Sequence, residues 1–107
     1  MYKYVYDIRY SDYKDFDTVK VSTVLNAIQE VAIRNSEYAG FGIDKLREMD
    51  RAWLLQGMNI RFEKSVKASS ELEAYTAVKS LHGVLSERGT IIKQNGEIVA
   101  KSITNMI

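Results

Sequence analysis

The sequence has 107 residues, of which 46% are hydrophobic, and its formal net charge at pH 7 is +1. A chain of this length predicts a single domain over residues 1–107, built on one core. The balanced charge, with no basic or acidic run, argues against a nucleic-acid partner and against binding to a charged membrane surface. Without cysteine there are no disulfides, thiolate metal ligands or thiol nucleophiles, and the single histidine, His82, cannot form a metal cluster. We therefore expect no metal and no cofactor, and the cysteine-free composition agrees with a cytoplasmic location.

The N-terminal segment "MYKYVYDIRY" alternates polar and apolar side chains over residues 2–10. This period of two predicts a β-strand with tyrosines on one face. The alternation is unlike a signal peptide, which has a charged start and a continuous apolar run. No segment approaches the roughly 18 apolar residues that a membrane-spanning helix needs. Residues 11–20 show no period, and we expect a loop there.

Apolar residues recur at intervals of three and four over residues 22–39, which predicts an amphipathic helix roughly 26 Å long. Ser22 or Thr23 is the expected N-cap, and Gly40 and Gly42 are the expected stop. One carboxylate, Glu30, falls beside the apolar positions of this helix. Its place there raises the question of whether the helix carries chemistry.

Four β-strands are expected after the helix, within residues 52–66, 69–84, 85–94 and 96–107. Asn95-Gly96 is the strongest hairpin signal, because a two-residue primed turn needs positive φ at both positions. Hairpin connections imply antiparallel pairing. The strands are about as long as the helix, so one curved five-stranded sheet could wrap it along its axis. That arrangement, of the α+β class, is the hotdog fold.

Specific residues of this pattern are similar to a known family. The run "STVLNAIQEVAIRNSEYAGFGIDKLREMDRAWLLQGMNIRFEK" resembles the first hotdog domain of acyl-carrier-protein (ACP) thioesterases, in which a "lLnllQEvA" helix precedes an "aWvL" strand. "LEAYTAVKS" and "SERGTIIKQNGEIVAKSITNMI" resemble two later strands of that domain. The resemblance runs from Tyr4 to the end of the sequence. It implies hydrolysis of fatty acyl thioesters to free fatty acids.

The sequence departs from the resembled family in two respects. These thioesterases usually have two hotdog domains, and their catalytic Asn and His belong to the second, which this sequence does not contain. Asn105 also stands where the family tends to have Trp. The sequence is either the first half of a two-domain enzyme or a one-domain relative that pairs with itself.

Thioester hydrolysis needs a base or nucleophile near the carbonyl and hydrogen-bond donors for the oxyanion. The helix N-terminus offers unpaired backbone N–H groups at residues 23–25, so Thr23 is a candidate substrate contact. In one type of single-domain hotdog thioesterase the catalytic carboxylate lies on the central helix, near the position of Glu30. In another type an Asp of the preceding loop acts. That position falls on Lys14 here, which would abolish the role, or on Asp15 with a one-residue slip.

Each candidate also has a structural interpretation. Glu30 could mark the border between the buried and the solvated helix face, and Asp15 could be a solvated turn residue. Trp53 is a candidate lining residue of an acyl cleft or an ordinary core residue. His82 is better explained as a turn residue than as a catalytic one.

Two functions of different classes follow. The first is a thioesterase acting on fatty acyl thioesters of ACP or coenzyme A, forming a homodimer or tetramer with sites at the interface. The second is a non-catalytic acyl- or carrier-binding domain that shapes a substrate pocket. Whether the chain is an enzyme depends on Glu30 and Asp15.

Overall fold

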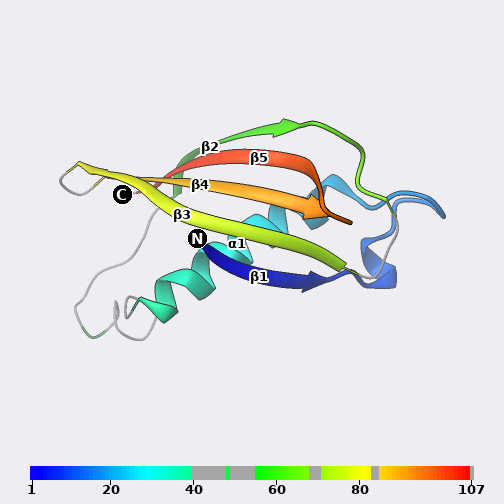
Figure 1. Ribbon diagram of the computed structural model, residues 1–107, viewed down its shortest axis with the longest axis horizontal. Helices are drawn as coiled ribbons and strands as arrows, with labels where there is room; N and C mark the ends of the chain where they lie inside the picture. Colours follow the sequence, from blue (N-terminus) through cyan, green and yellow to red (C-terminus); the bar gives the residue numbers. More distant parts are fainter. Residues whose placement is uncertain (40–47, 49–54, 68–70, 83–84, 107) are drawn as a thin grey trace.

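The computed structural model describes residues 1–39, 48, 55–67, 71–82 and 85–106. Its elements, in chain order, are β1 (Tyr2–Asp7), the 3-10 helix η1 (Tyr10–Asp12), α1 (Val21–Tyr38), β2 (Leu55–Phe62), β3 (Glu71–His82), β4 (Leu85–Gln94) and β5 (Glu97–Met106). The strands form one five-stranded sheet in the order β1-β3-β4-β5-β2. Figure 1 shows the curved sheet with α1 crossing one of its faces.

Every strand pair in the sheet is antiparallel, as the hairpin signals predict. The β4–β5 turn lies at Asn95 and Gly96, whose φ angles of 52° and 80° are both positive. The predicted primed hairpin at Asn95-Gly96 is therefore confirmed. β2 does not pair with β3, the next strand in the chain, but lies beside β5 at the edge of the sheet.

The core lies between α1 and the inner face of the sheet. α1 packs chiefly against β1, β3 and β4. Its buried face includes Val24, Ala27, Ile28 and Val31, which recur at the predicted spacing of three and four. Residues of alternate positions on the strands complete the core, among them Leu72, Ala74, Ile92 and Ala100.

The start of α1 differs from the prediction that Ser22 or Thr23 caps the helix. The helix begins at Val21, its N-cap is Lys20, and no side chain caps it. The backbone N–H of Lys20 donates to the carbonyl of Asp12, with an N–O distance of 2.7 Å, and Val19 pairs with Val66 at 3.1 Å. These long-range contacts set the start of the helix, so that Thr23 turns into the core instead of capping.

The first strand is shorter than the alternation of residues 2–10 predicts. Burial alternates along β1, with Tyr2, Tyr4 and Tyr6 half-buried. The strand ends at Asp7 because the Asp12 carboxylate accepts a hydrogen bond from the backbone N–H of Arg9, at 2.9 Å, and turns the chain into η1. Tyr10 is consequently 90% exposed instead of continuing the inner face of the strand.

Candidate functional site

A pocket of about 430 Å³ lies at the N-terminus of α1. One wall comes from the loop and first helical turn, with Lys14, Lys20, Val21 and Val24 among its lining residues, and the other from residues 62–66. Valine and phenylalanine side chains share the lining with polar and charged ones, among them Lys14, Lys20 and Glu63. The pocket therefore joins a lining that is part apolar and part polar to the end of the helix where backbone N–H groups are unpaired.

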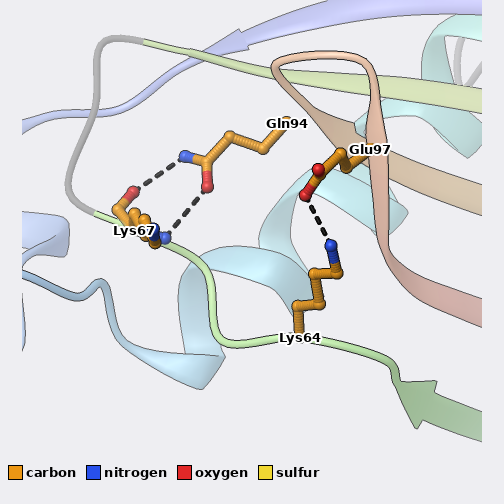
Figure 2. A network of polar contacts seen from close by, with 4 residues as sticks. All are labelled: Lys64, Lys67, Gln94 and Glu97. Atoms are coloured by element: carbon orange, nitrogen blue, oxygen red, sulfur yellow. Dashed lines mark hydrogen bonds and ion pairs between the residues drawn. The ribbon is translucent and has the colours of Figure 1, made fainter.

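The wall at residues 62–66 is fastened to the β4–β5 hairpin. Figure 2 shows that Gln94 donates from Nε2 to the carbonyl of Lys67, at 2.8 Å, and accepts from its backbone N–H at Oε1, at 2.9 Å. Beside it, Lys64 Nζ lies 2.6 Å from the carboxylate of Glu97. The backbone N–H groups of Glu63 and Lys64 also donate to the carbonyl of Val99. Segments far apart in sequence thus hold the wall in place.

The electrostatics of this pocket favour an anionic or electron-rich group. Lys14 and Lys20 are exposed lining residues, and the positive end of the α1 dipole faces the same space, whereas Glu63, a carboxylate of the lining, is paired with Arg61 at 3.2 Å. Glu97 balances the charge of Lys64, and the hydrogen bond from Lys64 lowers the pKa of the Glu97 carboxyl. The amide of Thr23 already donates to the carbonyl of Lys20, at 3.1 Å. The N–H groups that precede the first intrahelical bond are consequently those of Val21 and Ser22 rather than those of residues 23–25.

Asp15 organises the loop that leads to the pocket. Its Oδ1 accepts hydrogen bonds from the backbone N–H groups of Asp17 and Thr18, both at 2.8 Å, and from the Thr18 hydroxyl at 3.0 Å. These bonds, the one from Asp17 foremost, lower the pKa of the Asp15 carboxyl. Asp15 is exposed, and the neighbour that lines the pocket is Lys14.

Glu30 lies on the side of α1 that faces β1. Its Oε1 is 2.8 Å from Nε of Arg34, and 39% of its side chain is exposed. Arg34 in turn lies over the ring of Tyr4, at 4.3 Å from the centroid. Glu30 follows Val21 by about two and a half turns, which places it on the opposite side of the helix from the pocket. No hydrogen bond or ion pair among the described residues joins Glu30 to Asp15.

The two substrate-binding candidates have different outcomes. Thr23 is in the first turn of α1, but the residue is only 1% exposed and its buried Oγ1 has no hydrogen-bond partner among the described residues. Trp53 lies outside the described residues. His82 ends β3, and its side chain is likewise outside the description. Among the described residues, no group of three His, Asp or Glu side chains could hold a metal ion.

Arg88 is a polar residue of the interior that the sequence analysis did not select. It lies on the inner face of β4 and is 7% exposed. Its Nη1 donates to Asn35 Oδ1 on α1, at 2.7 Å, and to Thr76 Oγ1 on β3, at 3.2 Å. Burial lowers the pKa of the Arg88 guanidinium, which still stays charged at neutral pH. Arg88 stands two and four positions before Thr90 and Ile92, so a strand with alternating faces places all three side chains on the inner face. This spacing is the signal that could have identified it.

One long helix across a five-stranded antiparallel sheet defines the hotdog fold of the α+β class. Solved structures agree with this fold at low sequence identity. A hypothetical protein from Aquifex aeolicus is 17% identical, with a TM-score of 0.89, over 99% of this chain and 86% of that one. A Thermus thermophilus thioesterase, solved with coenzyme A and Zn, is 18% identical, with a TM-score of 0.82, over 98% and 76%. A probable thioesterase from Bartonella henselae is 14% identical, with a TM-score of 0.88, over 97% and 87%.

Sequence comparison identifies the family within this fold. The profile of the acyl-ACP thioesterase N-terminal domain matches residues 1–107, so the chain belongs to that family. The resemblance found in the "QEVA" helix and the later strands is thus confirmed. No curated protein sequence matches the chain significantly. In the described part of the chain, no helix has the length and apolar character to cross a membrane.

Proposed function

We propose that this chain acts on fatty acyl thioesters, presented by ACP or coenzyme A, in their hydrolysis to free fatty acids. The observation that carries the proposal is the pocket at the N-terminus of α1, whose lining combines apolar side chains with lysines. Free backbone N–H groups at such a helix end can donate to a thioester carbonyl or its oxyanion. Family membership supports the same reaction class. The coenzyme A bound to the Thermus thioesterase is consistent with a thioester substrate. We place the reaction in the cytoplasm.

Glu30 and Asp15 are the carboxylates proposed to assist hydrolysis. Hydrogen bonds occupy Oδ1 of Asp15 and Oε1 of Glu30, which leaves the second oxygen of each carboxylate for a water or a substrate group. The lowered pKa keeps Asp15 ionised at neutral pH, as a base requires, although it also weakens that base.

A second candidate is a non-catalytic domain that binds the acyl group or the carrier and leaves the chemistry to another domain. Its support is specific: neither Glu30 nor Asp15 lines the pocket, whereas Lys14 does. A lysine ammonium can hold an anionic group but cannot act as the general base that the loop carboxylate would supply.

Turnover of acyl thioesters separates the two functions. The purified chain is given decanoyl-coenzyme A and decanoyl-ACP, and released thiol is measured with a thiol-reactive dye. For the first function we expect turnover that falls at least about 100-fold in Glu30→Gln or Asp15→Asn, with Asp17→Asn as the control in the same loop. Turnover that survives both changes removes these residues from the mechanism. Binding without any turnover selects the second function.

The proposed form in solution is a homodimer or tetramer. β1 and β2 are the edges of the sheet, and an edge strand presents unpaired backbone groups to a second copy. Light scattering at micromolar concentration measures the state, and a monomer would count against catalysis by this chain alone.

A further inference from the structure

The inner face of the sheet is divided into an apolar half and a polar half. The apolar half contains Leu72, Ala74, Ile92 and Ala100. The polar half, here called the polar strip, consists of Thr76, Arg88, Thr90, Ser102 and Thr104, all of them buried. The strip crosses three neighbouring strands, because Thr76 pairs with Thr90, Thr90 with Ser102, and Arg88 with Thr104.

Arg88 brings an uncompensated charge into this strip. Its two hydrogen-bond acceptors, Asn35 and Thr76, are neutral, and within the described residues no carboxylate forms an ion pair with it. Both bonds come from Nη1, so Nε and Nη2 keep donors to offer. A buried charge is costly unless an opposite charge or a full set of hydrogen bonds accompanies it. Among the residues that the structure describes, the guanidinium therefore has no anionic partner.

Two hydroxyl groups of the strip are unsatisfied in the same place. Thr104 Oγ1 and Ser102 Oγ are buried and have no hydrogen-bond partner in the described part of the chain. Thr104 lies directly opposite Arg88 in the β4–β5 register, where facing side chains are about 5 Å apart. Nearly all buried polar atoms of proteins are hydrogen-bonded. Free hydroxyl donors beside free guanidinium donors form a group that can bind an anion.

Packing alone does not explain these residue types. Valine has nearly the shape of threonine, and methionine or leucine could fill the volume of Arg88 without a desolvation cost. One cation balances one negative charge, which fits a carboxylate, whereas a phosphate dianion would stay partly uncompensated. The flat, two-oxygen carboxylate also suits a guanidinium flanked by hydroxyls.

We propose that the polar strip, with Arg88 at its centre, binds the carboxylate of an acyl ligand. The inference deepens the proposed function and rests on it for the acyl part of that ligand. Two sources supply such a carboxylate. One is the free fatty acid released by hydrolysis, and the other is the far end of an acyl group that carries a second carboxylate.

Calorimetric titration of the purified protein tests the proposal without turnover. The probes are decanoate, 1-decanol, decanoyl-coenzyme A and the coenzyme A thioester of decanedioic acid. We expect a carboxylate ligand to bind about 10- to 100-fold more weakly to Arg88→Met and about tenfold more weakly to Thr104→Val. Decanol binding should not change. Selectivity for decanoate over decanol identifies the product acid, and selectivity for the decanedioic thioester over decanoyl-coenzyme A identifies the far-end carboxylate.

Two controls keep the test decisive. Arg61→Met removes the same charge from an arginine that is 80% exposed on β2 and should leave every affinity unchanged. Thr104→Val removes a hydroxyl without a partner, so it should not lower the melting temperature. No carboxylate selectivity in the unmodified protein, or selectivity that survives Arg88→Met, would overturn the inference. Arg88-dependent binding of decanoate by a protein that hydrolyses no thioester would instead contradict only the hydrolytic function.

Discussion

Asp15 shows how one side chain can set the shape of the loop in front of α1. A single oxygen accepts three hydrogen bonds, from Asp17 and from both the backbone and the side chain of Thr18. The turn places Lys14 on the pocket wall and leaves Asp15 outside it. At this scale a difference of one position in the loop decides which side chain lines the pocket.

Loss of the Asp15 carboxylate should have a pH-dependent cost. The hydrogen bonds hold the pKa of this carboxyl below its ordinary value near 4, so the folded state binds fewer protons than the unfolded one. The stabilisation is complete above that ordinary value and is lost as the pH falls through the folded pKa. We expect Asp15→Ala to lower the melting temperature at pH 7, by an amount that shrinks below about pH 4.

The matched control for this loop is Asp17→Ala. The Asp17 carboxylate makes no hydrogen bond or ion pair in the described part of the chain, so its removal should change the melting temperature little at any pH. Thermal denaturation followed by circular dichroism measures both variants. A deficit of Asp15→Ala that stays constant down to pH 2 would exclude the carboxylate as its origin.

The β4–β5 hairpin illustrates the scale of the element. Its turn needs positive φ at Asn95 and Gly96, which asparagine and glycine adopt with the least strain. The turn sets the register of the pairs beside it, Gln94 with Glu97 and Lys93 with Ile98, and an irregularity between Ile92 and Lys93 then shifts the register by one residue before Arg88 meets Thr104. A local backbone preference therefore closes the hairpin, whereas the pairs farther along the strands also depend on this irregularity.

Replacement of Gly96 should strain this turn. At a φ of 80° a Cβ atom is unfavourable, and Gly96→Ala should lower the free energy of unfolding by about 1 kcal/mol. Gly57→Ala on the edge strand β2 is the control, because an added Cβ there has no atom within 4 Å and φ is not positive. Urea denaturation measures both, and equal effects would contradict the explanation by turn strain.

At the scale of the whole molecule, long-range polar contacts close one end of an elongated body that measures 45 × 23 × 21 Å. Gln94 joins the end of β4 to the segment that follows β2, and Lys64 reaches Glu97 beside it (Figure 2). Val19 bonds to Val66 across the same end. The pocket at the N-terminus of α1 depends on these connections for its second wall.

Gln94 should therefore contribute far more to stability than its exposed neighbour. Gln94→Leu leaves the backbone N–H and carbonyl of Lys67 without these partners, and we expect a loss of about 1–3 kcal/mol in the free energy of unfolding. Glu97→Gln removes the charge of an exposed ion pair and should leave the unfolding midpoint nearly unchanged. Urea denaturation compares the two. A smaller effect for Gln94→Leu than for Glu97→Gln would show that the hydrogen bonds between Gln94 and Lys67 do not hold this end together.

Local patterns in the sequence were enough to determine the element order, the α1 period, the antiparallel strands and the Asn95-Gly96 turn. These features depend on backbone preference and on which face of an element is apolar, and both are written in neighbouring residues. The family resemblance carried by the "QEVA" helix likewise needed no coordinates.

The tertiary structure alone decided what the polar residues do. Lys20 is the N-cap in place of Ser22 or Thr23, because backbone hydrogen bonds from Lys20 to Asp12 and from Val19 to Val66 fix the chain just before the helix. Lys14 rather than Asp15 reached the pocket, and Arg88 met Asn35, 53 positions away. A polar side chain acts through whichever partner the register brings within about 3 Å, and that register is set by contacts between segments that no local pattern encodes.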